Sequence, residues 1–454
     1  MSLLHHSLKI DQGICKGCTH CMKQCPTQAI RIRDGHAHVL ANLCINCGQC
    51  LRVCPHGAIG IEQTPFDEIN KYKVRIAIVP AVFFAQFTDN YSMAHICQSI
   101  YRCGFTHVYL AETGVDVLNL LQPMTIDPHS LLISDYCPAV QKLIQMRYPL
   151  LLGNINLRRT PSQVMALFAR FEQKTKELDT SEIGIFYFTP CAAKIAEIKT
   201  AGSDGNSLFQ GAINFDTAYN KIRSILGTYK NVDDKLPSTF TFPLCTSKAS
   251  QWSTVKGECH GIKERALAVD EMHNVIEFLE QLEEEENTNL NFLELDACAE
   301  GCAGGVLTVR NRFLANERLR HWGQSLPTEL SDDLRERIEL QRENLKGKLV
   351  MEQPQSSEAL AWDTDTSKAL HKMENSRKIL SSLPGIDCGL CGAPTCKALS
   401  EDVAKSEASI RQCVVLKLKE PKQLNQLAKI WGERSKAEDP VLDTKGTETK
   451  PALS

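Results

Sequence analysis

The sequence lacks an apolar run long enough to cross a bilayer. Its longest apolar stretch, residues 74–87, is interrupted by Pro80 and falls short of the roughly 20 residues that a membrane helix needs. The N-terminus, Met-Ser-Leu-Leu-His-His, has neither the basic n-region nor the apolar h-region of a signal peptide. We therefore expect a cytoplasmic protein with no membrane partner.

A strong charge of one sign is missing as well. The 51 Lys and Arg residues nearly balance the 54 Asp and Glu residues, and the formal net charge is −3. Such a balance does not favour a nucleic-acid surface, so no nucleic-acid partner is expected. The 454 residues allow roughly three domains.

Cysteine, in contrast, is abundant. The chain has 20 cysteines, most of them in short regular spacings. In a reducing compartment such spacings favour metal sites over disulfides. The cysteine pattern therefore organises the rest of the interpretation.

Two cysteine runs of identical spacing make residues 1–66 an internal repeat. Each run reads Cys-x2-Cys-x2-Cys-x3-Cys-Pro, the spacing of bacterial two-cluster ferredoxins, in which the fourth cysteine of each run binds the other cluster. One 4Fe-4S cluster is thus expected on Cys15, Cys18, Cys21 and Cys54. The second is expected on Cys44, Cys47, Cys50 and Cys25. The alternative is a pair of zinc sites or a disulfide knot, which two matching runs ending in Cys-Pro disfavour.

Residues 70–350 are predicted to form an α/β domain. Apolar runs predict strands over residues 74–79, 107–110, 131–133, 183–188 and 292–295, and amphipathic stretches predict helices over 91–102, 140–146 and 162–176. Alternation of strand and helix is typical of mostly parallel sheets with helices on both faces.

Three of these strands run directly into cysteines. Cys137 follows residues 131–133, Cys191 follows residues 183–188, and Cys298 and Cys302 follow residues 292–295. Open parallel sheets place ligands beyond the carboxyl ends of their strands. Any one of these cysteines alone would more often be an inert buried residue, but their shared position favours a single cluster held by all four. Glycines after Cys302 leave room for a bulky inorganic group.

The C-terminal part contains a second cysteine pattern. A polar linker over 351–380, with a short helix before Leu383, is expected to precede a domain at 381–431, and a disordered tail is expected at 432–454. The domain carries Cys388, Cys391, Cys396 and Cys413, which suit a 4Fe-4S cluster. A four-thiolate zinc site is the alternative.

The three strand-end segments resemble the three signature motifs of FeFe hydrogenases. Residues 134–138 (Ser-Asp-Tyr-Cys-Pro) are similar to the first, residues 189–197 (Thr-Pro-Cys-Ala-Ala-Lys, with Glu197) to the second, and residues 297–305 to the third. The segment 388–413 resembles a small cluster domain found behind some hydrogenase-like chains. The resemblance spans about residues 70–350 and follows a ferredoxin module, as in many members.

The resemblance implies a cofactor and roles for the residues that match. Cys137, Cys191 and Cys298 would hold a 4Fe-4S cluster, and Cys302 would bridge it to a diiron unit carrying carbon monoxide and cyanide. Lys194 would donate a hydrogen bond to a cyanide ligand. Lys194 and Cys302 are thus the candidate catalytic residues.

The chain departs from the family pattern at several positions. Tyr136 stands where the first motif has a proton-relaying cysteine, and a phenol with a pKa of about 10 is a poorer relay than a thiol near 8.5. Thr189 and Asp296 replace methionines; for Asp296, capping of a turn is favoured over a substitute proton-carrying role. Val306 and Leu307 replace a glycine and a glutamine. These changes point to divergent branches, including those thought to sense hydrogen.

Three functions stay open at this level. The first is reversible reduction of protons to hydrogen, with electrons from a redox partner such as ferredoxin. The second is sensing of hydrogen or redox state, with the signal passed to a downstream signalling protein. The third is an iron–sulfur scaffold or electron carrier without a diiron unit. The interpretation we prefer is slow hydrogen chemistry with a sensing role.

Overall fold

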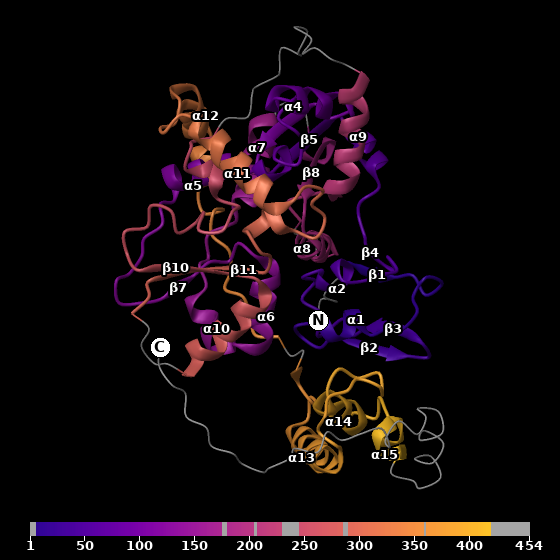
Figure 1. The fold of residues 1–454 in the computed structure, drawn as a ribbon. Coiled ribbons are helices and arrows are strands. Elements are labelled where there is room, and N and C mark those ends of the chain that lie inside the picture. Colours follow the sequence, from indigo (N-terminus) through magenta and orange to yellow (C-terminus); the bar gives the residue numbers. More distant parts are fainter. Residues whose placement is uncertain are drawn as a thin grey trace, which may run out of the picture. The chain divides into compact units, whose positions relative to one another are not determined.

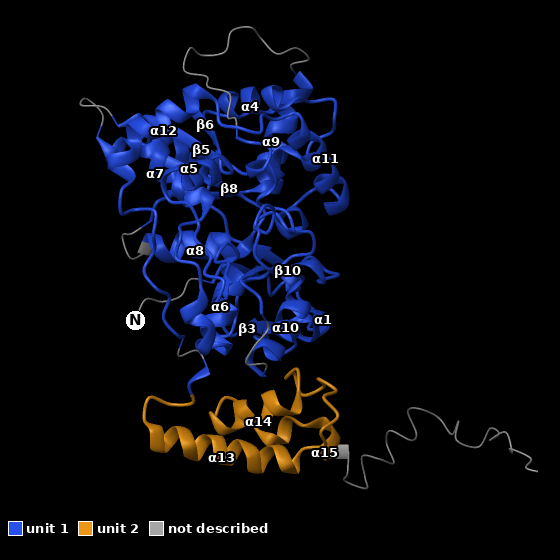
Figure 2. Cartoon of the chain, turned by 90° about the vertical axis from the view of Figure 1, so that its left-hand side faces the viewer, with its two compact units in different colours: residues 1–361 blue, residues 362–454 orange. Residues whose placement is uncertain are grey.

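The chain divides into two compact units, residues 1–361 and residues 362–454 (Figure 2). The computed structural model describes residues 6–174, 179–203, 207–228, 245–284, 289–357 and 360–418. The tail expected at 432–454 lies outside the described residues. The fold is mixed α/β, as predicted.

The N-terminal part of the first unit is built from two similar halves. β1 (Leu8–Ile10) pairs antiparallel with β4 (Ile59–Ile61), and β2 (Ile30–Arg33) pairs antiparallel with β3 (His36–Val39). Two short helices, α1 (His20–Gln24) and α2 (Gln49–Arg52), each contain the third cysteine of a run. The two cysteine runs of the sequence thus form two structurally similar halves.

A four-stranded parallel sheet forms the upper part of the first unit in Figure 1. Its strand order is β6 (His107–Leu110), β5 (Val74–Val79), β8 (Ile183–Thr189) and β9 (Gly211–Asn214). Helix α4 (Met93–Arg102) packs with α9 (Phe215–Thr228), and α5 (Thr113–Leu121) packs with α7 (Pro161–Gln173). The predicted strands at 74–79 and 107–110 are confirmed, whereas β9 was not predicted.

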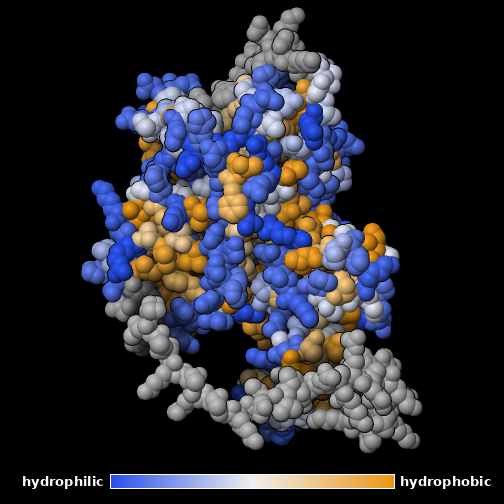
Figure 3. All heavy atoms as spheres, viewed as in Figure 1, coloured by the Kyte–Doolittle hydropathy of each residue, from blue (hydrophilic) through white to orange (hydrophobic). Residues whose placement is uncertain are grey.

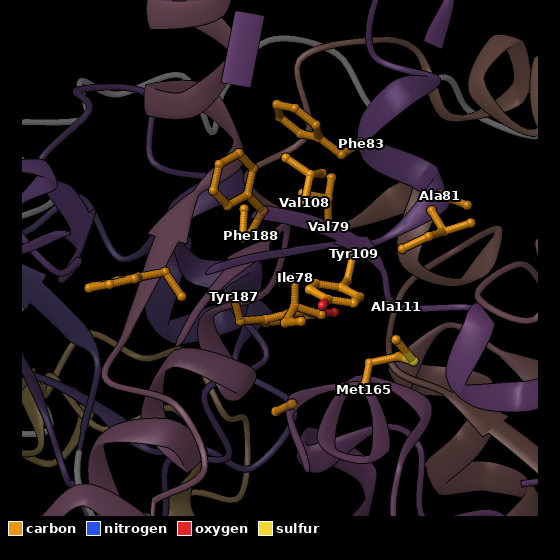
Figure 4. Close-up of a cluster of buried hydrophobic side chains, with 14 of the residues drawn as sticks. Ile78, Val79, Ala81, Phe83, Val108, Tyr109, Ala111, Met165, Tyr187 and Phe188 are labelled. Atoms are coloured by element: carbon orange, nitrogen blue, oxygen red, sulfur yellow. The ribbon is translucent and has the colours of Figure 1, made fainter. Parts of the chain in front are cut away.

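The core of this sheet is aromatic and aliphatic. Phe83, Phe188 and Ile78 lie among the buried side chains of Figure 4. The Phe83 ring stands edge-on to Phe188, with centroids 5.3 Å apart. On the face of the molecule drawn in Figure 3, hydrophilic and hydrophobic residues are mixed. The packed core fixes the strand ends that carry the candidate site.

A second, three-stranded sheet contributes the other two predicted strands. Its order is β10 (Ala266–Asp270), β11 (Phe292–Asp296) and β7 (Leu132–Ile133), all parallel. Helices α6 (Pro138–Arg147) and α10 (Met272–Glu284) pack beside it. The parallel pairing was predicted, but its division between two separate sheets was not.

The remaining helices of the first unit connect these layers. They are η1 (Phe66–Lys71), α3 (Ala81–Phe84), η2 (Pro149–Asn154), η3 (Thr180–Glu182), α8 (Ala192–Ser203), η4 (Ala249–Gln251), η5 (Gly301–Gly304), α11 (Arg312–Gln324) and α12 (Asp332–Leu345).

The second unit contains three α-helices in its described part. These are α13 (Thr366–Ser382), α14 (Cys396–Ala404) and α15 (Val414–Leu418), with a short η7 (Ile410–Gln412). Asp365 caps α13 by accepting hydrogen bonds from the backbone N–H groups of Ser367 and Lys368. The short helix expected before Leu383 is therefore a 17-residue helix, and it occupies the second half of the predicted linker.

No helix within the described ranges is both long and apolar enough to span a membrane.

Candidate metal centre

The strand-end cysteines lie where the two parallel sheets of the first unit meet. Cys137 follows β7 and is the N-cap of α6, and Cys191 lies between β8 and α8. Cys298 and Cys302 follow β11, with Cys302 inside η5. Because β8 belongs to one sheet and β7 and β11 to the other, the four cysteines come from the carboxyl ends of both sheets.

The structure brings these four thiols within electrostatic reach of one another. Burial and then the neighbouring Cys191, Cys137 and Cys302 hold the pKa of Cys298 well above its usual range. Burial, Asp296 and Cys191 raise the pKa of Cys137 to about 12. Thiolates that repel one another in this way need nearby positive charge, which the irons of a cluster supply. The donor set therefore fits a 4Fe-4S cluster.

The turn after β11 is tightly packed around Cys302. Glu300 and Gly301 both adopt positive φ, 64° and 63°. A Cβ on Gly304 would lie 1.9 Å from the carbonyl oxygen of Ala299, so only glycine fits there. The Cys302 backbone N–H donates to the carbonyl of Ser253 at 2.9 Å. These contacts fix the direction in which the Cys302 thiol leaves the backbone.

Lys194 is a buried lysine in the middle of the cysteines. Only 3 % of its surface is exposed, which excludes a surface lysine at a helix start. Its Nζ donates to the Tyr136 carbonyl at 3.2 Å and lies 4.4 Å above the Tyr136 ring. Burial alone would lower the pKa of Lys194, but Glu197, Cys302 and the other thiols outweigh burial and raise it. Lys194 is therefore a fixed positive charge among the thiols.

Tyr136 contacts the sulfur of the third motif. Its hydroxyl lies 3.7 Å from the Cys302 Sγ, and its side chain is buried. Burial first, and then the charge of Cys302, hold the pKa of Tyr136 well above its ordinary value. The phenol is thus a neutral group in contact with both Cys302 and Lys194.

Glu112 is a candidate functional residue that the sequence analysis missed. It is 2 % exposed and accepts hydrogen bonds from the Ala81 N–H at 2.7 Å and the Ser253 hydroxyl at 3.1 Å. Burial raises its pKa to about 7, and its charge reaches Tyr136. Glu112 follows β6 by two residues, so the strand-end rule that found the cysteines also applies to it.

A group of buried acids lies beneath the cysteine turn. The Glu294 carboxylate accepts hydrogen bonds from the backbone N–H groups of Glu258 and Cys259, at 3.0 and 2.9 Å. Asp296 ends β11, and burial followed by Glu294 raises its pKa. Among the described residues the Asp296 carboxylate accepts no hydrogen bond, so the turn-capping role predicted for it is not observed.

The cysteines of the N-terminal repeat fall into the two groups that their spacing predicts. Burial first, and then the neighbouring Cys15, Cys18 and Cys54, raise the pKa of Cys21 to about 11. The electrostatic neighbours of Cys47 are Cys25, Cys44 and Cys50. Each group includes the fourth cysteine of the other run, whereas iron binding itself stays a prediction.

The C-terminal cysteines also converge. Cys388 and Cys413 both raise the pKa of Cys391, after the larger effect of burial. Cys391 packs with Cys396 and Cys413 around one small apolar cluster. In the described part of the chain, no three His, Cys, Asp or Glu side chains are placed to hold a single metal ion. The four thiolates of a 4Fe-4S cluster bind different irons, so this finding does not bear on a cluster.

Comparison with family models matches three segments. Residues 7–60 match a 4Fe-4S dicluster domain, residues 72–217 match the iron-only hydrogenase large subunit, C-terminal domain, and residues 383–415 match a putative Fe-S cluster domain. These matches support 4Fe-4S clusters and confirm the predicted order of modules. No curated protein matches the chain in sequence.

Solved structures with a similar fold include FeFe-hydrogenases at low identity. A variant of HydA1 from Chlamydomonas reinhardtii is 14 % identical, with a TM-score of 0.47, over 64 % of this chain and 98 % of that one. A structure described as stepwise H-cluster assembly in HydA(deltaEFG) is 13 % identical, with a TM-score of 0.46, over the same shares.

Proposed function

Because this chain is a divergent FeFe hydrogenase-like protein with an N-terminal iron–sulfur module, we propose that it performs slow, reversible hydrogen chemistry and uses it to sense hydrogen or redox state. The reaction is 2H⁺ + 2e⁻ to H₂. The observation that carries the proposal is the convergence of Cys137, Cys191, Cys298 and Cys302 around the buried Lys194.

The proposed cofactor is a 4Fe-4S cluster on Cys137, Cys191, Cys298 and Cys302, joined through Cys302 to a diiron unit with carbonyl and cyanide ligands. When bound, this group supplies the redox and hydrogen-binding chemistry. The chain's own contribution is to orient the thiols, to exclude water and to hold the Lys194 ammonium in position.

Electrons would enter through the N-terminal module from a redox partner such as ferredoxin. In this structure that module touches the cysteine turn, because Arg52 donates to the Gly304 carbonyl and Val306 packs against Gly48. Val306 replaces a glycine of the third motif, so this divergent position forms part of the contact. The short connection favours electron transfer between the two sites.

Tyr136 supports the slow, sensory version over ordinary ferredoxin-linked turnover. A neutral buried phenol with a raised pKa is a weak acid and a weak base near neutral pH, so it relays protons poorly. Glu112, with its pKa near 7, is better suited to hold a proton and lies close enough for its charge to act on Tyr136.

Restoring the thiol tests this version directly. We expect Tyr136→Cys to raise hydrogen uptake by anaerobically matured protein about tenfold or more, since a positioned general acid or base contributes roughly 10²–10⁴-fold. Tyr136→Phe is the matched control, since it keeps the ring and removes the hydroxyl. Equal rates for all three proteins would show that a missing proton relay does not limit turnover.

A second candidate function is an iron–sulfur scaffold or electron carrier without the diiron unit. The observation in its favour is that the Tyr136 side chain contacts both Cys302 and Lys194, the two groups that would face a diiron unit. Infrared spectra of matured protein separate the two candidates. Carbonyl and cyanide stretching bands are expected for the first, and their absence after proven maturation supports the second.

A further inference from the structure

A pocket lined by several basic side chains lies beside residues 253–255, which contact the Cys302 loop. It has a volume of about 490 Å³ and is formed by residues 247–260, the end of α11 and Thr328. Its cationic or titratable side chains are Lys248, Lys256, His260 and Arg320, and none of the described residues that line it carries a carboxylate side chain. A chain with a net charge of −3 thus concentrates positive charge in one hollow.

The positive groups of this pocket are solvent-exposed. Among the described residues, Lys248, Lys256 and Arg320 form no ion pair. Other lysines of the first unit do form one, such as Lys199 with Glu62 at 3.0 Å. An anion bound in the pocket would supply the counter-ion that these groups lack within the described ranges.

Lys248 is a solvent-exposed lysine whose ammonium group lies beside Gly261. Gly261 has a φ of +87°, and a Cβ at this position would lie 2.5 Å from the Lys248 Nζ. A side chain at residue 261 would therefore displace the Lys248 ammonium from its present position. The lining also includes five side chains that can form hydrogen bonds: Ser247, Gln251, Thr254, Gln324 and Thr328.

We propose that this pocket binds a phosphate-bearing small molecule of about nucleotide size. Lysine and arginine side chains are the usual partners of phosphate groups, and the volume lies within the range of small-molecule sites. The hydroxyl and amide groups of the lining supply donors and acceptors for the remainder of the ligand.

The pocket and the candidate metal centre are connected through residues 253–255, which contact Gly301 and Cys302. Thr254 and Val255 line it, and a Cβ on Gly301 would lie 2.9 Å from the Val255 N and 2.8 Å from the Ser253 carbonyl oxygen. Ser253 also accepts the hydrogen bond from the Cys302 N–H. A ligand that presses on residues 254–257 therefore acts on the backbone that positions Cys302. This coupling rests on the proposed function, whereas binding itself does not.

Binding is tested by isothermal titration calorimetry on the full chain, with ATP and inorganic pyrophosphate as probes. We expect Arg320→Glu and Lys248→Ala each to weaken binding by about tenfold or more, as expected for loss of a charge-assisted contact. Arg335→Glu is the matched control, because Arg335 is an exposed helical arginine outside the pocket, and it should change affinity little.

The two probes distinguish the source of the phosphate chemistry. Similar affinity for both supports recognition of the phosphates alone, and tighter binding of ATP supports contacts to the rest of the nucleotide. Absence of heat with either probe overturns the proposal, as does binding that Arg320→Glu and Arg335→Glu weaken equally. Far-ultraviolet circular dichroism of each variant verifies that it is folded.

Coupling needs a separate readout. Electron paramagnetic resonance of the reduced, reconstituted chain is recorded with and without ATP. We expect the signal of the strand-end centre to change while those of the N-terminal clusters stay constant. Unchanged spectra with intact ATP binding would overturn the coupling and leave the binding site in place.

Discussion

In the N-terminal module, three cysteines of each group lie close together in sequence, and local turns and a short helix set their positions. Backbone amides reach the sulfurs directly, as from Ala29 N to Cys25 Sγ at 3.2 Å and from Ala58 N to Cys54 Sγ at 3.3 Å. The strand-end centre draws its cysteines from three distant loops and two sheets, and it adds a buried lysine. The first site thus depends on local sequence, and the second depends on the packing of the whole unit.

The largest expected effect is the loss of a whole cluster when one of its cysteine ligands is replaced, and it should differ between the strand-end centre and the N-terminal module. Cys298→Ser should remove one cluster, about four irons per chain, while Cys18→Ser should remove a different one. Iron and sulfide analysis with electron paramagnetic resonance would assign each loss. Cys103→Ser, which lies outside every motif, is the control. A Cys298→Ser protein with the iron content and spectrum of the parent would contradict the ligand assignment.

Lys194 sharpens the comparison, because the N-terminal module has no buried lysine of this kind. Lys194→Met leaves the half-buried Glu197 without the positive charge that lowers its pKa, and we expect a loss of stability on the order of 3 kcal/mol. Denaturant unfolding measures it. The double variant Lys194→Met/Glu197→Gln should recover a large part of that loss, and a double variant as unstable as the single one would rule out this electrostatic account.

The dependence of the strand-end centre on tight packing can be tested without replacing any of its cysteines. Gly304→Ala places a Cβ against the Ala299 carbonyl, and overpacking of this kind costs about 1–3 kcal/mol or more. Gly153→Ala is the matched control, since nothing lies within 4 Å of the added Cβ. We expect only Gly304→Ala to lower the melting temperature and the occupancy of the strand-end centre. Equal melting temperatures would argue against a tightly packed turn.

The smallest expected effect is a pH dependence due to Glu112. Burial raises its pKa from 4.5 to about 7. A carboxyl raised in this way stabilises the fold fully below pH 4.5, and that contribution is lost as the pH rises through the folded-state value. Glu112→Gln should therefore flatten the fall in melting temperature between about pH 5 and about pH 8. Glu336→Gln, on the exposed face of α12, should keep the parental slope.

Much of this organisation was accessible from the sequence because it follows from short-range spacing. Cysteine runs predicted the two N-terminal groups, and apolar periodicity predicted β5 and β6 at the bounds observed. The separation into two sheets was not predicted, since hydrophobic pattern alone does not tell which strands pair. Glu112 was missed for a related reason: its importance comes from burial and from contacts with Ala81 and Ser253, which are far away in sequence.

The position of Tyr136 shows the same limit within a recognised motif. The sequence identified it as a departure, in the place of a proton-relaying cysteine. Only the fold reveals that the phenol touches both Cys302 and Lys194. Comparison with a motif shows which functional group the chain lacks. The contacts of the residue that replaces it depend on neighbours from other strands, which the motif does not reveal.

The division of the cysteines between two sheets has a consequence for how the protein matures. Cys191 follows a strand of one sheet, and Cys137, Cys298 and Cys302 follow strands of the other. An inorganic group bound by all four would therefore cross-link the two sheets. Its insertion would lock the sheets together, so that loading and the last step of folding become a single event. Oxidative loss of this centre would then also weaken the packing between the two sheets of the first unit.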